Sequence, residues 1–418
     1  MAYKYTKLTE ENYLKNRTIV SDDIESILCS ISNTLGIDLN LHTYPSGSDI
    51  GTWIVPDSWN VCEAWIKNLD GEIIASYKDH PLFVAPYSAS FKGKVTLEEL
   101  KKHVRLHPRR DDAYYYEHRL AYDYNLRHSD WVITLPRSVM NELKDEEYEI
   151  CIDLDVKPGD MLIGEFVLPG SSDREIALLA DYCHPGQVND SWSGILALID
   201  VMKEISNWSD RKYTYRFLIF PETIGSSVLL EDKPEYIYNT DLAIFSEFVG
   251  WGEDWRILSS DSASSVSKIV AKKFDNLIVD DLHAGYGNDE IVYDFAGVPA
   301  ISVQMIHCEE YHSSDDHPKL LDQKNIDIAI STILQVCKTM EKDMRLKFKQ
   351  NVPFYQTRYN LYNDSVYDTE KFLFNRKINQ GIKNGSSLIE ISTSEGIPFD
   401  YVYKYAIKLI DCKVAEVY

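Results

Sequence analysis

The sequence predicts an α/β protein whose central sheet is mostly parallel and covered by helices on both faces. From Glu175 onward, short apolar runs typical of buried strands alternate with amphipathic runs typical of helices. This alternation produces parallel strands with helices packed on either side. Two other regions differ, a strand-rich stretch at 45–159 and a tail at 365–418. We therefore expect a discontinuous core made of 1–44 and 160–350, and two further domains.

The predicted core contains helices at both of its ends. Within residues 1–38, apolar side chains recur at the spacing that places them on one helix face, and Gly36 follows as a stop signal. This face consists of Ile24, Ile27, Leu28, Ile31 and Leu35. The run from Asn325 to Met344 has a similar pattern and predicts a long helix.

Residues 45–159 predict an inserted β-rich domain. Turn-forming residues are frequent near its start, and several short runs with alternating or wholly apolar residues follow. Asp70-Gly71 separates two of these runs and suits a hairpin turn. The sequence leaves open whether this domain shapes a cleft or makes a dimer contact, so a homo-oligomer is one of the expected states.

The tail at 365–418 predicts a small winged helix, because its pattern reads helix, turn, helix and then a short strand. From Asn375 onward it holds six basic and five acidic residues. Such a balance is too weak for a strong phosphate-binding surface, and Asp400 stands at the helix start where base contacts are usually made. We expect this domain to contact protein rather than nucleic acid.

Bulk composition excludes several classes of protein. The chain has 418 residues and a formal net charge of −23, which disfavours nucleic acid as a partner. Its seven cysteines are an odd number without a CxxC pair, which favours a reduced, cytoplasmic protein. The N-terminus has no apolar signal segment, and no apolar run approaches the length of a membrane span.

A histidine and an aspartate follow the first buried strand of the α/β region. His184 comes directly after the run that ends at Asp181, and Asp190 stands just before a predicted helix. Both are good positions for metal ligands, because the loop between them is stiffened by Pro185 and Gly186. The alternative is that Asp190 only caps the helix and His184 is an ordinary loop residue.

Two glutamates occupy comparable places on the next strands. Glu222 follows a buried strand and could act as general base for a metal-bound water. Its alternative role is to stabilise the first turn of the next helix. Glu247 interrupts an apolar strand, where a buried carboxylate needs a partner or a metal. Alternation along the strand could instead turn it toward solvent.

A second histidine, His312, follows the last predicted strand and is flanked by carboxylates that could orient its second ring nitrogen. An acidic loop with Asp289 and Glu290 precedes that strand. The two histidines, Asp190 and the two glutamates Glu222 and Glu247 are expected at one edge of the sheet, where the parallel strands end. Together they comprise the imidazole and carboxylate ligands of a zinc hydrolase.

The motifs resemble those of the zinc aminopeptidase clan that includes bacterial leucyl aminopeptidases and glutaminyl cyclases. The segments HPGQVNDSWSG, FLIFPETIGS, IFSEFVG and YHSSDD match its metal and catalytic motifs in order and spacing. Together with the tail and the stretch YPSGSDIGTWIVPDSWNVCEAWIKN, they are also similar to bacterial aminopeptidase-like proteins with an inserted β domain and a C-terminal winged helix. Several of those proteins accompany polysaccharide biosynthesis genes.

The resemblance implies a role for each of these residues. It implies His184, Asp190 and His312 as metal ligands, Glu247 as a further ligand, and Glu222 as general base. Members with two zinc ions have two adjacent glutamates, whereas here Thr223 follows Glu222. Threonine is a poor zinc ligand, so we expect one zinc ion per chain and leave a second open. Alternatively, Glu222 itself binds the metal and the base is unassigned.

The expected activity is hydrolysis of a small or peptide-like amide by metal-activated water. Asp289 or Glu290 is expected to hold a substrate ammonium group, and Tyr311 to donate to the developing oxyanion. Three alternatives remain. The first is an amide hydrolase acting on amino-sugar or polysaccharide precursors, and the second is a metal-binding pseudo-peptidase scaffold. The third is a regulator that uses the winged helix, which the charge of the tail disfavours.

Overall fold

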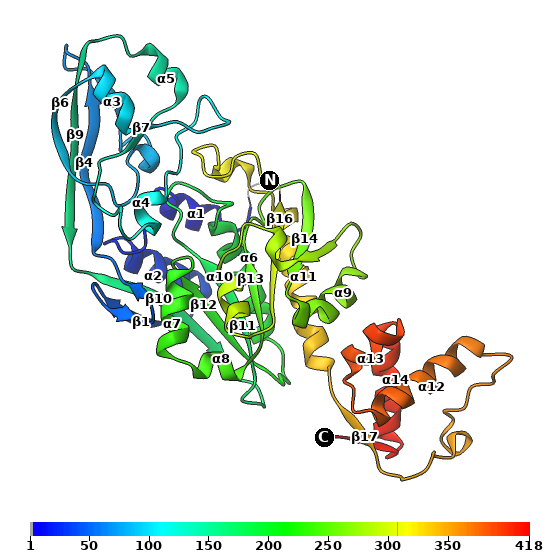
Figure 1. Ribbon diagram of the computed structural model, residues 1–418. Helices are drawn as coiled ribbons and strands as arrows, with labels where there is room; N and C mark the ends of the chain where they lie inside the picture. Colours follow the sequence, from blue (N-terminus) through cyan, green and yellow to red (C-terminus); the bar gives the residue numbers. More distant parts are fainter. Residues whose placement is uncertain (1–2, 307) are drawn as a thin grey trace.

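The computed structural model describes residues 3–306 and 308–418 (Figure 1). At its centre is an eight-stranded sheet with the order β1-β10-β12-β11-β13-β16-β14-β15. These strands are β1 (Asn40–Pro45), β10 (Asp160–Leu168), β11 (Glu175–Asp181), β12 (Thr214–Phe220), β13 (Thr240–Ser246), β14 (Asp254–Ser259), β15 (Ile278–Asp281) and β16 (Ala300–Ile306).

The four middle strands β12, β11, β13 and β16 are parallel, as the alternating sequence pattern predicts. Toward the edges the sheet becomes mixed, because β10 pairs antiparallel with both β1 and β12, and β14 pairs antiparallel with β16. Only the loop 247–253 separates β13 from β14. A connection this short cannot form the crossover that parallel strands require, so β14 runs in the opposite direction.

Helices cover both faces of the sheet. Those on one face include α6 (Trp192–Ser206), α9 (Ser264–Ala271) and α11 (Gln323–Lys342), and those on the other include α7 (Ile224–Asp232) and α10 (Asp289–Phe295). On β11, Ile176 and Leu178 enter the first core, while Ala177 and Leu179 enter the second. Burial on both faces explains why residues 176–180 of this strand are all apolar. The remaining core helices are α1 (Thr6–Asn12), α2 (Ile24–Leu35) and α8 (Glu235–Asn239).

Between β1 and β10 the chain forms a four-stranded antiparallel sheet, β5-β4-β9-β6. The predicted Asp70-Gly71 turn joins β4 to β5, and Gly71 takes φ +84°, which glycine adopts without strain. Trp59 and Ile150 of this segment share a core with Leu179 of the central sheet. The elements are β2 (Asp49–Ile50), β3 (Trp53–Ile54), β4 (Ser58–Lys67), β5 (Ile73–Ser76), β6 (Phe91–Thr96), α3 (Leu97–His103), β7 (Val104–Arg105), α4 (Arg119–Tyr122), β8 (Ile133–Thr134), α5 (Arg137–Glu142) and β9 (Glu147–Lys157).

The C-terminal helices, drawn in orange and red in Figure 1, gather at one end of the molecule. They are α12 (Thr369–Lys383), α13 (Leu388–Glu395) and α14 (Phe399–Asp411), followed by β18 (Ala415–Val417), which pairs with β17 (Leu346–Phe348). α13 packs against α9 of the core. From α13 onward the order of elements agrees with the sequence pattern, α12 is an additional helix, and the assignment as a winged helix stays a prediction. In the described part of the chain, no helix is long and apolar enough to cross a membrane.

Candidate metal centre

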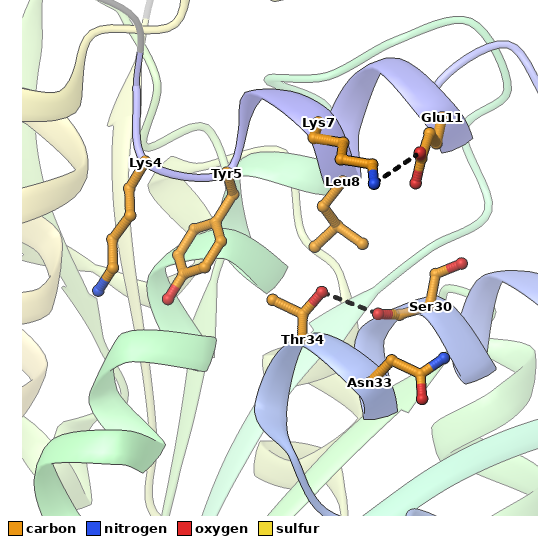
Figure 2. A pocket seen from close by; sticks show the side chains of 8 residues that line it. All are labelled: Lys4, Tyr5, Lys7, Leu8, Glu11, Ser30, Asn33 and Thr34. Carbon is orange, nitrogen blue, oxygen red and sulfur yellow. Dashed lines mark hydrogen bonds and ion pairs between the residues drawn. The ribbon is translucent and has the colours of Figure 1, made fainter.

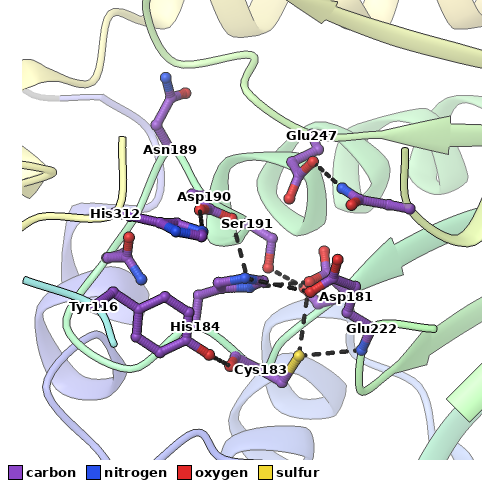
Figure 3. A network of polar contacts seen from close by, with 12 residues as sticks. Tyr116, Asp181, Cys183, His184, Asn189, Asp190, Ser191, Glu222, Glu247 and His312 are labelled. Atoms are coloured by element: carbon purple, nitrogen blue, oxygen red, sulfur yellow. Dashed lines mark hydrogen bonds and ion pairs between the residues drawn. The ribbon is translucent and has the colours of Figure 1, made fainter. Parts of the chain in front are cut away.

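The predicted site residues converge at the edge of the sheet where its middle strands end. The loop between β11 and α6 carries His184 and Asp190. Glu222 follows β12, Glu247 follows β13, and His312 lies in the loop after β16. Figure 3 shows these five side chains directed toward one another. Parallel strands bring their ends to one edge, which explains why residues so distant in sequence meet here.

Asp190 lies between the two histidines. Its Oδ1 is 3.4 Å from His184 Nδ1, and its Oδ2 is 3.4 Å from His312 Nε2. Ligand atoms of the three residues lie within 4.8 Å of one another. Among the described residues, Asp190 Oδ2 and His184 Nδ1 have no hydrogen-bond partner although both are buried. Two imidazoles and a carboxylate that converge in this way fit a zinc ion.

The local structure decides between the alternatives that the sequence leaves open. Ser191, not Asp190, is the N-cap residue of α6, so capping does not account for the aspartate. Glu247 is only 1% exposed, which excludes the solvent-facing orientation. Its Oε1 has no partner among the described residues, and Asn288 Nδ2 donates to its Oε2.

Two buried charged residues fix the loop that carries His184 and Asp190. The guanidinium of Arg17 donates to the backbone carbonyls of His184 and Gln187, and to that of Tyr182 at 3.2 Å. The Asp316 carboxylate accepts three successive backbone N–H groups, from Val188 at 2.8 Å, Asn189 at 2.7 Å and Asp190 at 3.0 Å. The loop is therefore held from both sides. Arg17 was not predicted, because no local pattern links it to a loop so far along the chain.

Glu222 lies next to two groups that the sequence did not single out. Tyr122 donates its hydroxyl to Glu222 Oε2 at 3.1 Å, and its oxygen is 3.2 Å from Cys183 Sγ. The backbone N–H of Glu222 donates to the same sulfur at 3.1 Å. Glu222 Oε2 is also 3.4 Å from His184 Nε2. Tyr122 belongs to the inserted segment, so a residue from outside the central sheet holds the candidate base.

Aromatic rings position His312. Tyr311 stacks on its ring with centroids 3.8 Å apart, and Tyr286 stacks on Tyr311 at 4.5 Å. The acidic residues after His312 do not orient its second nitrogen as predicted. Asp315 pairs with Arg110, and Asp316 is occupied by the backbone N–H groups of the loop 188–190.

Asp289 and Glu290 are buried behind the wall of the site. Asp289 accepts hydrogen bonds from the backbone N–H of Thr223 at 3.0 Å and from the Ser226 hydroxyl. Glu290 accepts the backbone N–H of Asn288 at 3.2 Å, at the start of α10. Neither acidic residue is among those that line the cavity of the site. Their expected contact with a substrate ammonium group therefore has no support in this geometry.

Buried carboxylates crowd the site, and several of them oppose one another's ionisation. Burial raises the pKa of Glu222 to about 7, with Asp181 and Asp190 raising it further and His184 opposing them. Burial and the same two aspartates also hold the pKa of Glu247 well above its ordinary value. Burial opposes ionisation of Asp190 as well, but the two histidines beside it lower its pKa to about 2. A divalent cation would allow the other carboxylates to ionise too.

Asp181 is a further buried carboxylate that the sequence analysis did not single out. It is the last residue of β11 and is fully buried. Its Oδ2 lies 3.2 Å from His184 Nδ1, and its Oδ1 has no hydrogen-bond partner among the described residues. The signal that identified Glu247, a carboxylate interrupting an apolar run, was also present at Asp181. In the described part of the chain, Arg17 is the only lysine or arginine that is fully buried among these acids.

The site opens into a cavity of about 310 Å³. Its wall includes four residues of the inserted segment, namely Trp53, Tyr116, His118 and Tyr122. The remaining lining residues are His184, Asp190, Glu222, Thr223, Glu247, Phe248, Tyr286, Gly287, Asn288, Tyr311 and His312. No lysine or arginine of the described chain lines it. The inserted segment thus shapes the cleft, and the wall is aromatic and acidic.

Another hollow, of about 370 Å³, lies between α1 and α2 (Figure 2). It is lined mainly by polar side chains such as Lys7 and Glu11, which form an exposed ion pair at 3.7 Å. The buried histidines and carboxylates of the metal centre do not line it. The cavity at the sheet edge is therefore the better candidate for chemistry.

Residues 6–343 match the family model described as a domain of unknown function, DUF4910. A Clostridium acetobutylicum protein described as a polysaccharide biosynthesis protein with an aminopeptidase-like domain is 28% identical over 352 residues. That alignment covers 80% of this chain and 77% of the relative.

Solved structures agree with the predicted fold. A crystal structure described as a peptidase from Clostridium acetobutylicum superposes with a TM-score of 0.82 at 24% identity, covering 99% of this chain and 96% of that one. The zinc aminopeptidase BSAP from Bacillus subtilis gives a TM-score of 0.56 at 14% identity, covering 80% and 93%. A peptidase M28 precursor from Shewanella amazonensis gives 0.59 at 13%, covering 81% and 92%. The central sheet and its helices have the fold of zinc aminopeptidases, as the motifs predicted.

Proposed function

The chain belongs to the DUF4910 family, and from its zinc aminopeptidase fold and its site we propose that it is a zinc-dependent amide hydrolase of aminopeptidase type. The observation that carries this proposal is the position of Asp190, whose two oxygens each face a different buried histidine. We assign His184, Asp190 and His312 as metal ligands and Glu247 as a further ligand. All four lie at the sheet edge where strand ends meet a cavity.

Each residue near the site has a task that follows from its contacts. A bound zinc ion would supply a water of lowered pKa and polarise the substrate carbonyl. Glu222 lines the cavity and is held by Tyr122, so its carboxylate can accept a proton from water and return it to the leaving nitrogen. Asn288 holds Glu247, and stacking on Tyr311 fixes the ring of His312. The Tyr311 hydroxyl remains our candidate donor to the oxyanion.

The cavity wall favours a particular kind of substrate. It is acidic and aromatic, and no cationic side chain of the described residues lines it. An amide that carries an amine or an uncharged group fits this wall, whereas a carboxylate or phosphate beside the scissile bond would be repelled. We therefore propose small or peptide-like amides with a neutral or basic group next to the bond.

A second candidate function is hydrolysis of an amide on an amino sugar. It is favoured by the name of the Clostridium relative, which refers to polysaccharide biosynthesis, and by aromatic rings such as Trp53 and Tyr286 on the cavity wall. A sugar ring can pack on such surfaces while its amide reaches the metal. We further propose a cytoplasmic location, consistent with seven cysteines that are all unpaired.

Metal analysis tests the proposed function directly. The protein is purified without chelator, and its zinc is counted by elemental mass spectrometry beside His184→Ala and His312→Ala. The exposed His283 provides a control, since His283→Ala leaves the site intact. We expect zinc in the parent and the control, and its loss in both site variants.

A screen of aminoacyl amides and acylated amino sugars then identifies the substrate class. Turnover of aminoacyl amides supports the first function, and turnover of acylated amino sugars supports the second. A parent that neither retains nor regains zinc would overturn the metal assignment. Bound zinc without turnover of any amide would instead identify a pseudo-peptidase, in line with Thr223 beside Glu222.

A further inference from the structure

A second group of candidate ligands lies on the inner side of His184. It contains Asp181, Cys183 and Glu222, and one ligand atom from each of these and from His184 lies within 4.8 Å of the others. Figure 3 shows the Cys183 sulfur between the Asp181 carboxylate and the backbone nitrogen of Glu222. This group adjoins the site assigned above, but it adds a soft sulfur ligand that the first position does not contain.

Burial raises the pKa of the Cys183 thiol to about 11, so a metal would have to displace its proton to bind the sulfur. The Glu222 backbone N–H donates to Cys183 Sγ at 3.1 Å, and the Tyr122 oxygen lies 3.2 Å away. The Tyr122 hydroxyl gives its own proton to Glu222, so its oxygen can accept the Cys183 thiol proton, and Asp181 Oδ2 is a second acceptor at the longer distance of 3.9 Å. The backbone N–H of Glu222 would stabilise the charge of a metal-bound thiolate without competing for the metal.

An unsatisfied carboxylate points to a ligand at the same place. Asp181 is fully buried, with 0% of its surface accessible to solvent. Its Oδ1 has no hydrogen-bond partner among the described residues. An ionised carboxylate in such a position is costly unless it meets a cation. Arg17, the nearby buried cation, donates to backbone carbonyls and does not satisfy this oxygen.

We propose that Cys183, Asp181 and Glu222 form a second, inner position for zinc or another thiophilic divalent cation. The proposal rests on the proposed function, because His184 is assigned to the first metal and the three remaining residues are left for the inner one. A thiolate and two carboxylates suit such an ion. Binding forms a metal–sulfur bond and releases the thiol proton to solvent.

Occupancy of the inner position has a consequence for catalysis. Glu222 would bind the second ion, and its carboxylate could then no longer accept a proton from water. Metal in the inner position therefore inhibits the enzyme. The inner position fills after the first one, because Cys183 does not line the cavity and lies behind its wall. Excess metal should inhibit the enzyme through this cysteine.

Cobalt titration of the full chain tests the inner position without a substrate. Metal-free protein is titrated anaerobically with Co²⁺, while visible d–d bands report binding and a near-ultraviolet band reports sulfur–cobalt bonds. We expect d–d bands with the first equivalent and the charge-transfer band only with the second. Cys183→Ser should abolish the second band, and Asp181→Asn should weaken it.

The controls separate this proposal from others. The two exposed cysteines, Cys29 and Cys62, could bind cobalt adventitiously, so the C29S/C62S variant must keep the band. Thermal unfolding checks that Cys183→Ser still folds, and Asp181→Asn gives an independent second variant. A charge-transfer band that persists in Cys183→Ser, or never forms in the parent, would overturn the inner position alone. Absence of all cobalt bands would contradict the proposed function itself.

Discussion

Asp316 accepts the backbone N–H of Asp190 at 3.0 Å and so fixes the residue that lies between the two histidines. The same carboxylate accepts the N–H groups of Val188 and Asn189, so one side chain fixes the backbone that leads to Asp190. Burial raises the pKa of Asp316 to about 7, although these N–H donors oppose that effect. The metal loop therefore depends on a residue that is not itself placed to bind metal.

Asp316→Asn should weaken zinc binding by about 10- to 100-fold, because an amide cannot accept three N–H groups as a carboxylate does and the loop loses its orientation. Zinc affinity is measured by competition with a chromophoric chelator. Asp315→Asn, which alters only a partly exposed pair with Arg110, is the matched control. An unchanged affinity in Asp316→Asn would show that the loop orders itself without this carboxylate.

Arg17→Lys should lower the free energy of unfolding by about 3 kcal/mol. Lysine keeps the charge but cannot reach the three carbonyls that the guanidinium contacts, so buried acceptors lose their donors. Urea unfolding is recorded with chelator present, so that metal loss does not contribute. Arg211→Lys, at a partly exposed arginine that also donates to carbonyls, should change stability by less than about 1 kcal/mol.

Gly194→Ala should destabilise the protein and displace Glu247. A Cβ added at Gly194 would lie 1.8 Å from the backbone oxygen of Ser246, the residue before Glu247. Relieving this overlap must move α6 away from β13, at a cost of about 1–3 kcal/mol or more. Gly93→Ala serves as control, since its nearest neighbour is a Phe91 ring carbon at 3.5 Å. Equal thermal stability of both variants and of the parent would contradict the close approach.

Glu165 should contribute stability that disappears in acid. Burial opposes its ionisation, but hydrogen bonds from His42 and Tyr236 help to lower its pKa from 4.5 to about 2. A lowered pKa in the folded state stabilises the protein fully above pH 4.5, and this contribution is lost as the pH falls toward 2. The stability difference between the parent and Glu165→Gln, measured by urea unfolding, should shrink from pH 6 to about pH 3. A difference independent of pH would contradict the ionised state.

Glu222→Gln should retain the first zinc ion but lose turnover by at least about 100-fold, because glutamine cannot accept the proton from water. The measurement combines zinc content with the rate on the best amide from the screen. Glu231→Gln, at an exposed position on α7, is expected to behave as the parent. Full turnover in Glu222→Gln would remove Glu222 as the general base and leave its carboxylate free for a ligand role.

The sequence alone determined the fold class and the residues that gather at the sheet edge. Strand–helix alternation after Glu175 predicts a parallel sheet, and strands in such a sheet end together, which was enough to bring His184, Glu222 and His312 to one place. These inferences succeed because local patterns and strand direction are short-range properties of the chain.

Only the tertiary structure decided which side chains support the site. Arg17, Tyr122 and Asp316 reach it from distant segments, and no local pattern of the sequence indicates such contacts. The cavity lining also could not be read from the sequence, since Glu247 and Asp289 are both buried but only Glu247 lines the cavity. The contribution of the inserted segment to the cavity wall became visible for the same reason. Packing between remote segments decides which side chains are neighbours, and these neighbours determine the hydrogen bonds and the protonation of each group in the site.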